Sequence, residues 1–398
     1  MRLRWAVIGL AVFVLVLGLL GVLLGSWVKR RTTPPPPPIV VELPEVPADN
    51  GYDHFVSAAE MFVDTGVDLS TQPGVAVTAD QRDALGQNEE ALAELRRGLD
   101  KECVVPVEAP TPASWDRATA LRQLGRLLLM QSRLASGDGR LAEAVPPLLD
   151  GLRFGAKLEV GANILYRLTA HAIQGTTLEE LQRLAASQRL AEAELVAALR
   201  VLGQIEANAP PMDQTIEAEC QGAEAGASGM GRPRAGPVSL SEEKVSAALR
   251  EERDAAVRLS RKPYADVRAA IDSARPRPSL SPSKALAQTL SPTYRKCIEK
   301  DFLMRSRRRG TQVLLAVELY RLRHGNLPQS LSDLESLEIP GVALSLTDPL
   351  TEKPYVYRVQ NGDYLLYSVG MDLKDDGGAK QSFSAAEPGD LLLHTPSE

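Results

Sequence analysis

The stretch NILYRLTAHAIQGTTLEELQRLA (residues 163–185) decides the fold class. Its apolar residues recur three and four positions apart, which is the spacing of an α-helix and not of a β-strand. The stretches LAEAVPPLLDGLRFGAKLEV (141–160) and AEAELVAALRVLGQIEA (191–207) repeat this pattern on either side. Helices joined by such short turns pack as antiparallel neighbours. We therefore expect a mainly α protein, with a helical bundle or irregular solenoid over residues 51–207.

Part of this region resembles a single tetratricopeptide-type hairpin, over Leu134–Leu158 with Gly139 at the turn. No second copy follows at the roughly 34-residue period of such repeats, and Pro146–Pro147 interrupts the pattern, so a generic bundle or solenoid is favoured. His171 lies among apolar helix residues. There we expect a hydrogen-bonded helix residue rather than a metal ligand or a catalytic base.

The first hydrophobic stretch is WAVIGLAVFVLVLGLLGVLLGSWV, residues 5–28, which carries no charge. At about 1.5 Å per residue it is long enough to cross a hydrocarbon core of about 30 Å. A signal peptide has a shorter apolar region of about 7–15 residues, so an anchor is favoured over a signal peptide or a buried core helix. We predict a transmembrane anchor over residues 1–31 that contacts the lipid bilayer through residues 5–28.

The orientation of this anchor depends on the charges that flank it. Arg2 and Arg4 precede the apolar stretch and residues 29–31 (KRR) follow it, which is nearly a tie under the positive-inside rule. Residues 32–81 contain neither Lys nor Arg. This absence favours a single-pass protein with the bulk of its chain outside the cytoplasm.

Residues 32–50 form the predicted linker. Five successive prolines, Pro34–Pro38, favour polyproline II and make a semi-rigid spacer. A ligand for an SH3 or WW domain is the alternative interpretation, and a spacer is the simpler one.

The composition excludes several classes of protein. Of 398 residues, 44% are hydrophobic and 5% aromatic, which excludes a disordered chain and a disulfide scaffold. Lys+Arg 45 against Asp+Glu 51 give a net charge of -6, so nucleic acid is not an expected partner. Four histidines and three cysteines leave few ligands for zinc or haem. Cys103, Cys220 and Cys297 allow at most one internal disulfide, and free buried thiols are favoured.

The pattern changes twice after residue 207. Residues 208–240 are rich in Gly, Ala and Pro and predict a flexible loop, whose GASGMG passage lacks the strand and the lysine of a phosphate-binding loop. A helical pattern resumes over residues 241–309 and ends in the basic run Arg305–Arg309. We interpret this run as a solvated face with local acidic partners, rather than as a site for anionic lipid or nucleic acid.

Residues 310–398 combine the end of a helix with short β-elements. Tyr355, Tyr357, Tyr364 and Tyr367 flank Asn361–Gly362. An Asn-Gly pair between two such runs is a strong signal for an antiparallel hairpin. We therefore expect a small α+β module at this end of the chain.

The same region contains AVELYRLRHGNLP, TDPLTEKPYVYRV, DYLLYSVGMDLKDDGG and GDLLLHTP in this order. Over about residues 310–396, this order resembles the C-terminal module of the major pseudopilins of type II secretion. The shared pattern is a helix ending Y-x-x-x-x-G-x-x-P, an Asp-Pro turn before Pro-Tyr-x-Tyr, and a Tyr-Ser-x-Gly-x-Asp stretch that leads into Gly-Gly and a late Asp. The matching residues are Tyr320, Gly325, Pro328, Asp348, Pro349, Pro354, Tyr355, Tyr357, Tyr367, Ser368, Gly370, Asp372, Gly377, Gly378 and Asp390.

In that family the late acidic loop binds calcium, and the resemblance implies the same ion here. The candidate ligands are Asp372, Asp375, Asp376 and Asp390. Their carboxylates are the hard oxygen donors that calcium prefers. The alternative is a turn in which Asp and Gly serve the backbone geometry. Asp372 and Asp390 are the stronger candidates because their positions match the motif.

The chain also departs from the pseudopilin pattern. Its apolar N-terminal stretch has no acidic residue and no Phe-Thr-Leu-Ile-Glu start, and about 280 residues separate it from the module. Filament assembly is therefore not implied. The remainder, with Asn50–Tyr52 after the linker and Asn88–Ala91 opening a helix, resembles anchored helical proteins of unknown role from bacteria with GC-rich genomes. This resemblance implies the bacterial inner (cytoplasmic) membrane as the location.

Two classes of function remain open. We favour a non-enzymatic extracytoplasmic protein that contacts other proteins in secretion or envelope organisation. The alternative is an envelope hydrolase, but the sequence lacks a nucleophile elbow, a zinc helix and a linked Ser/His/Asp motif. Asp53–His54 is the only acid–histidine neighbour pair, and adjacent helix residues point about 100° apart, so a structural role is favoured.

Overall fold

The computed structural model describes residues 39–69, 75–229, 234–235, 238–239, 241–274, 281–339, 342, 344–378 and 389–396. The chain divides into two compact units, residues 1–40 and residues 41–398. Apart from residues 39 and 40, everything described belongs to the second unit.

The second unit is mainly helical, as the sequence predicts. Its first helices are α2 (Gly51–Met61), α3 (Ala79–Gln87), α4 (Glu89–Leu99), α5 (Pro112–Gly137), α6 (Leu141–Glu159), α7 (Ile164–Ala186) and α8 (Glu192–Ala207). They are followed by α9 (Met212–Gly229), α10 (Glu242–Ser260), α11 (Tyr264–Asp272), α12 (Pro282–Ala287), α13 (Ser291–His324) and the 3-10 helix η1 (Leu331–Ser336). The strands are β1 (Arg234–Ala235), β2 (Val238–Ser239), β3 (Val356–Gln360), β4 (Asp363–Ser368) and β5 (Leu391–His394).

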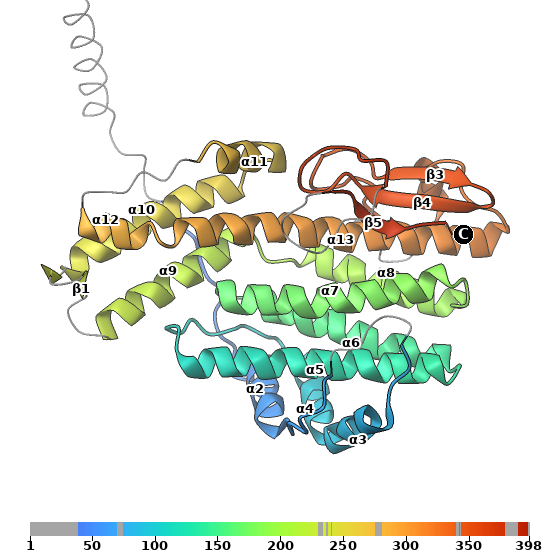
Figure 1. Cartoon of the computed structure of the whole chain (residues 1–398), viewed down its shortest axis with the longest axis horizontal. Coiled ribbons are helices and arrows are strands. Elements are labelled where there is room, and N and C mark those ends of the chain that lie inside the picture. Colours follow the sequence, from blue (N-terminus) through green and yellow to red (C-terminus); the bar gives the residue numbers. More distant parts are fainter. Residues whose placement is uncertain are drawn as a thin grey trace, which may run out of the picture. The chain divides into compact units, whose positions relative to one another are not determined.

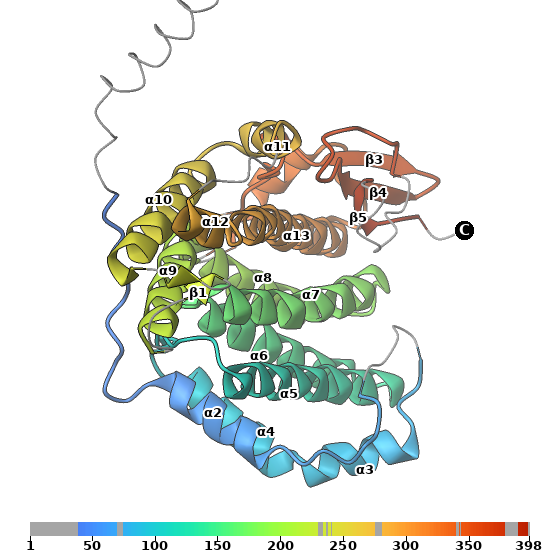
Figure 2. The ribbon, with the colours of Figure 1, turned by 60° about the vertical axis from the view of Figure 1, so that its left-hand side comes forward.

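The helices of this unit stack in layers (Figure 2). Helices α2 to α4 cover one side of the α5–α6 layer, α7 and α8 form the next layer, and α13 lies over α7 and α8. The C-terminal half of α13 carries the three-stranded sheet, whereas its N-terminal half lies beside α10 to α12 (Figure 1). One helix thus joins the helical body to the C-terminal module.

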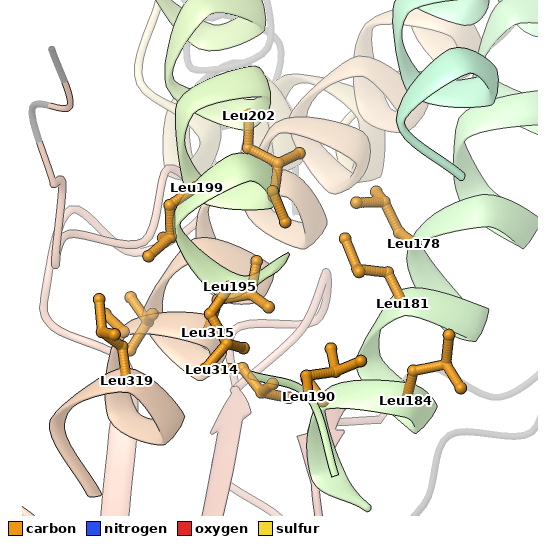
Figure 3. Close-up of a cluster of buried hydrophobic side chains, with 14 of the residues drawn as sticks. Leu178, Leu181, Leu184, Leu190, Leu195, Leu199, Leu202, Leu314, Leu315 and Leu319 are labelled. Carbon is orange, nitrogen blue, oxygen red and sulfur yellow. The ribbon is translucent and has the colours of Figure 1, made fainter. Parts of the chain in front are cut away.

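Leucines from α7, α8 and α13, and from the turn between α7 and α8, fill the space between these three helices (Figure 3). A fully buried leucine contributes about 1.5–3 kcal/mol through the hydrophobic effect, so this cluster is a main source of stability between the layers. Its labelled members are Leu178, Leu181, Leu184, Leu190, Leu195, Leu199, Leu202, Leu314, Leu315 and Leu319.

Helix α13 runs without a break across residues 309–310, where the sequence suggested a boundary between a helical region and the C-terminal module. With 34 residues it extends about 50 Å at 1.5 Å per residue. It ends at Gly325, whose φ of 76° is left-handed and whose N–H bonds to the carbonyl of Arg321. The module therefore shares its helix with the body.

The segment 208–240 differs from the flexible loop expected from its composition. It contains helix α9 and the short antiparallel pair β1–β2. Small residues let this helix approach its neighbours closely, since a Cβ atom at Gly222 would lie 2.7 Å from the carbonyl oxygen of Glu108. Buried Ile216 and Cys220 supply the apolar contact that composition alone understates.

The predicted hairpin is present. Strands β3 and β4 pair antiparallel with Gln360 opposite Asp363, and β5 adds to the other side of β4. Asn361 and Gly362 both have positive φ, 50° and 81°, which is the type I′ turn that an Asn-Gly pair favours.

The four tyrosines of the hairpin attach it to the rest of the module. Each hydroxyl donates one hydrogen bond, and in three cases the acceptor lies on α13 or on the loop that follows it. The pairs are Tyr355 with the Ser306 carbonyl (2.7 Å), Tyr357 with the Pro328 carbonyl (2.8 Å), Tyr364 with Glu318 (2.7 Å) and Tyr367 with Asp375 (2.7 Å).

Buried Asp348 holds the turn before β3 against α13 and β4. Its carboxylate accepts hydrogen bonds from the hydroxyls of Ser306 (2.7 Å) and Ser368 (2.6 Å), and from the N–H of Leu350 (3.0 Å). The Asp348–Pro349 turn is thus connected by hydrogen bonds both to helix α13 and to strand β4.

Replacing Gly370 by Ala should destabilise the module strongly. The residue has a φ of +73°, and a Cβ atom would lie 2.1 Å from the carbonyl oxygen of Gly389. A left-handed alanine alone costs about 1–2 kcal/mol, and the overlap with backbone adds to it. Gly325→Ala is the matched control, because its φ is +76° and nothing lies within 4 Å. If urea unfolding shows that both variants lose the same free energy of unfolding, the close contact between Gly370 and Gly389 does not destabilise Gly370→Ala.

The structure contradicts the prediction of a transmembrane helix. Across the described residues, which start at residue 39, no helix is both long and apolar enough to span a bilayer. Helix α13 has the length, but charged residues such as Asp301 and Arg308 interrupt its apolar surface. This finding contradicts the prediction of a fold with a transmembrane helix. It equally contradicts the predicted signal anchor and the predicted single-pass location in the inner membrane. The stretch 5–28 and the Pro34–Pro38 run lie outside the described residues.

Candidate functional site

Charged side chains are buried where α6, α7 and α13 meet. Glu159 is the last residue of α6, Arg167 and His171 lie on α7, and Asp301 and Arg308 lie on α13. All five are almost inaccessible to solvent. We call this group the buried charge cluster. Its two guanidinium groups balance its two carboxylates.

Local structure places these residues on facing helix surfaces. Asn163 caps α7 by accepting a hydrogen bond from the N–H of Tyr166 (3.2 Å), which fixes where the helix starts. Arg167 and His171 then lie four residues apart on one face, and Asp301 and Arg308 lie seven apart on one face of α13.

The carboxylate of Glu159 is the centre of the cluster. It accepts hydrogen bonds from Nη1 of Arg308 (3.1 and 3.3 Å) and from Nε2 of Gln174 (2.7 Å). Nη1 of Arg167 lies 3.7 Å away, and Nη2 of Arg167 donates to Asp301 at 2.5 Å. Three helices are thus joined through one carboxylate.

These contacts shift the ionisation of all three titratable groups at the centre. Burial opposes the charge on Glu159, but Arg167 and Arg308 outweigh it and lower its pKa to about 2. Burial likewise opposes the charge on Asp301, and Arg167 outweighs it, so the pKa of Asp301 is lowered. Burial lowers the pKa of His171 to about 4, so its ring is neutral at pH 7.

His171 differs from the hydrogen-bonded helix residue expected from the sequence. Among the described residues neither of its ring nitrogens has a hydrogen-bond partner. Its Nε2 lies 3.6 Å from Glu159 and 3.7 Å from Asp301. Because solvent does not reach these atoms, the arrangement is suited to holding three helices together and not to acting on a substrate.

The basic run 305–309 is not the solvated face that the sequence indicated. Arg308 is fully buried in the cluster. The expected acidic partners do occur: Arg308 binds Glu159, and Arg309 binds Glu206 at 2.5 Å. The guanidinium of Arg305 lies over the ring of Phe302, 5.6 Å from its centroid. Arg308 is buried because its side chain points toward α6 and α7, where it contacts Glu159 and Gln174.

A depression of about 630 Å³ opens at the C-terminal end of α13. It is framed by the hairpin tip, the end of α13, the loop after α13 and the turn between α7 and α8. Its lining mixes amide, apolar and cationic groups. The lining residues are Gln188, Arg321, Gly325, Asn326, Leu327, Pro328, Gln329, Val359 and Gly362. We call it the hairpin-tip depression.

Arg321 connects this depression to titratable residues behind it. Arg321 lies 3.4 Å from Asp363 and 3.7 Å from Glu318. His394 lies 3.0 Å from the same oxygen of Asp363, and Tyr364 donates to Glu318. Burial raises the pKa of Glu318. An acid paired with an imidazole is an arrangement that general acid–base chemistry uses. Here, however, Asp363 also contacts Arg321, and the ring of His394 packs against the ring of Tyr364.

Three of the four candidate calcium ligands accept hydrogen bonds from backbone N–H groups, and the first two are Asp390 and Asp372. Asp390 is buried and accepts hydrogen bonds from the N–H groups of Asp376 (3.3 Å) and Gly378 (2.6 Å), and burial raises its pKa. Asp372 accepts a hydrogen bond from the N–H of Lys374 (3.2 Å). These bonds are those of the turn that the sequence offered as the alternative.

The remaining candidates, Asp375 and Asp376, lie in the exposed part of the loop. Asp375 accepts hydrogen bonds from the hydroxyl of Tyr367 and the N–H of Gly377. In the part of the chain that the structure describes, no three acidic, histidine or cysteine side chains are grouped to hold an ion. Residues 379–388, which complete this loop, lie outside that part. Calcium therefore stays a prediction.

The other sequence candidates are also placed. His54 does not pair with its neighbour Asp53; its Nδ1 lies 2.6 Å from Glu94. The three cysteines are free and buried.

Sequence reasoning missed Glu159, Asp301 and the Asp363–His394 pair. A signal existed for Glu159, because Leu152, Gly155 and Ala156 precede it at the spacing of one helix face. No comparable signal existed for Asp363 and His394, which are 31 residues apart in the chain.

Comparison of this chain with known proteins does not assign it to a family. No family model, no curated protein and no solved structure matches this chain. The likeness of residues 310–396 to major pseudopilins therefore remains a prediction from sequence.

Proposed function

We propose that this protein binds other proteins without catalysing a reaction, and that a partner occupies the hairpin-tip depression. The observation that carries the proposal is the depression itself, an open hollow of about 630 Å³ framed by three separate segments of the chain. Val359 lines it and is 48% exposed. A hollow with an exposed apolar side chain in its lining offers a place where an apolar side chain of a partner can be buried.

The state of the charged groups supports binding over chemistry. The buried charge cluster is closed to solvent, and behind the depression Arg321 is engaged by Asp363 and Glu318. A catalytic group has to reach its substrate, whereas these groups contact one another. The pseudopilin-like pattern of residues 310–396 connects the proposal to secretion or envelope organisation.

Site-specific photo-crosslinking tests this proposal. A photoreactive residue is placed at Val359 in the full chain, in the source cells, and the matched control carries it at Leu286. Leu286 is similarly exposed, at 40%, but lies on α12 near the opposite end of α13 (Figure 1). We expect a discrete product at position 359, containing a secretion or envelope component, and none at position 286.

The proposal fails if position 359 yields no product, or the same products as position 286. It also fails if secretion and envelope components are no more frequent than in crosslinks of an unrelated protein. Introducing Val359→Glu beside a photoreactive residue at Gln329 should reduce the yield, because a charge would then enter the apolar part of the lining.

We further propose that the acidic loop binds calcium, on the strength of the oxygen donors Asp372, Asp375, Asp376 and Asp390. Calcium should raise the melting temperature of the full chain relative to chelator. Asp372→Asn should remove this difference, because it deletes a charge without deleting the oxygen. Asp68→Asn, on the loop after α2, is the control. Identical melting with calcium and with chelator would remove the ion from the proposal.

A further inference from the structure

The N-terminal half of α5 presents a second surface with a distinct chemistry. Trp115, Thr119, Arg122 and Arg126 follow one another at spacings of four, three and four residues, so they lie along one face of the helix over about 16 Å. All four are exposed, and Trp115 is 58% exposed. We call this face the Trp–Arg stripe.

Trp115 is unusual among the apolar side chains of this protein. Within the described residues, every other tryptophan, tyrosine or phenylalanine is buried or half-buried. An exposed tryptophan leaves a large apolar area in water, and tryptophan is among the residues that contribute most binding energy at protein interfaces. Its position at the start of the stripe offers an apolar anchor.

The two arginines of the stripe lack the acidic partners that most arginines here possess. Arg122 donates to the hydroxyl of Thr119 (3.1 Å), and Arg126 donates to the amide oxygen of Gln123 (2.9 Å). Within the described ranges, neither guanidinium lies within ion-pair distance of a carboxylate. The nearest acid along this half of the helix, Asp116, points about 100° away from Trp115.

We infer that the Trp–Arg stripe docks a carboxylate-rich segment of another protein. Charge complementarity decides the partner's chemistry: two uncompensated guanidinium groups favour carboxylates, with which they form bidentate hydrogen bonds. The anchor beside them favours a partner that also carries an apolar side chain. The stripe lies on α5, whereas the hairpin-tip depression lies at the end of α13, so this inference does not rest on the function proposed above.

Crosslinking combined with charge removal tests the inference. A photoreactive residue at Thr119 in the full chain should give a discrete product in the source cells, and mass spectrometry should locate the crosslink in a partner peptide with an excess of Asp and Glu. The double variant Arg122→Gln/Arg126→Gln should reduce the yield at least tenfold. The control Arg200→Gln/Arg258→Gln removes the same charge from exposed positions on α8 and α10 and should leave the yield unchanged.

Thermal melting of both double variants should show that neither loses its fold, because exposed arginines contribute little to stability. The inference is overturned if no product forms at position 119, if the crosslinked peptide is not acidic, or if the Arg122/Arg126 variant crosslinks as well as the control. It is also overturned if the product is a second copy of this chain. Binding of the purified protein to phosphatidylglycerol vesicles, lost on the same double substitution, would replace it with a lipid-binding surface.

Discussion

Replacing Glu159 by Gln is expected to lower the free energy of unfolding by about 3–5 kcal/mol, the cost of breaking a buried ion pair by removing one partner. The substitution keeps the size of the side chain but leaves Arg167 and Arg308 with Asp301 as the one remaining carboxylate of the cluster. The pKa of Glu159 supports this magnitude. A folded-state value of about 2, against an ordinary 4.5, corresponds to about 3 kcal/mol.

Urea unfolding at pH 7 measures this loss. Glu143→Gln is the control, because Glu143 forms an ion pair with Arg140 while 62% of its side chain is exposed. Such surface pairs contribute at most about 1 kcal/mol. A loss for Glu159→Gln as small as that of the control would show that the cluster does not hold the helices together.

The same substitution should change the acid sensitivity of the protein. Because the pKa of Glu159 is lower in the folded state, its contribution is complete above about pH 4.5 and is lost as the pH falls toward 2. The parent protein should therefore lose stability over this range faster than Glu159→Gln does.

The second large effect concerns His171 and a higher pH range. Its pKa falls from 6.5 to about 4 on folding, because burial disfavours the charged ring. The unfolded chain therefore takes up this proton first, and the contribution of neutral His171 is complete above about pH 6.5 and lost as the pH falls to about 4. The difference amounts to about 3 kcal/mol. We expect His171→Gln, which cannot titrate, to lose less stability than the parent between pH 6.5 and 4.5.

The comparison of slopes isolates His171 from other groups. The pKa values of Glu219, Glu299 and Glu318 are raised by burial, so their contributions change in the opposite direction, but they are the same in parent and variant. His324→Gln is the matched control, since this histidine is exposed at the end of α13. Parallel pH profiles for the parent and His171→Gln would contradict the assignment of a neutral buried ring.

Much of the helical body could be predicted from the sequence because its signals are local. Thr78 and Gln81 form the capping box that starts α3, with hydrogen bonds of 3.2 and 3.1 Å between side chains and backbone. Asn361–Gly362 adopts the turn that this pair favours. Such features depend on residues that are only a few positions apart, so a short stretch of sequence is enough to predict them.

Apart from the transmembrane helix, two predictions failed because burial was judged from composition. Residues 208–240 contain few large apolar side chains, yet α9 buries Ile216 and Cys220, and Gly222 lets it pack closely against the carbonyl of Glu108. The sequence predicts a solvated face for Arg308, because four arginines within five helical positions point in several directions and charged residues are usually exposed. Its partner Glu159 is 149 residues away in the chain, and no local pattern links the two.

The sequence by itself determined most helices of the body and the hairpin, because these follow from periodicity and turn residues. Only the tertiary structure decided which charges are buried together, which tyrosine meets which acceptor, and where the depression and the Trp–Arg stripe lie. The physical reason is that burial and ion pairing depend on the distance between side chains in space. Packing of α6, α7 and α13 sets that distance, not separation along the chain.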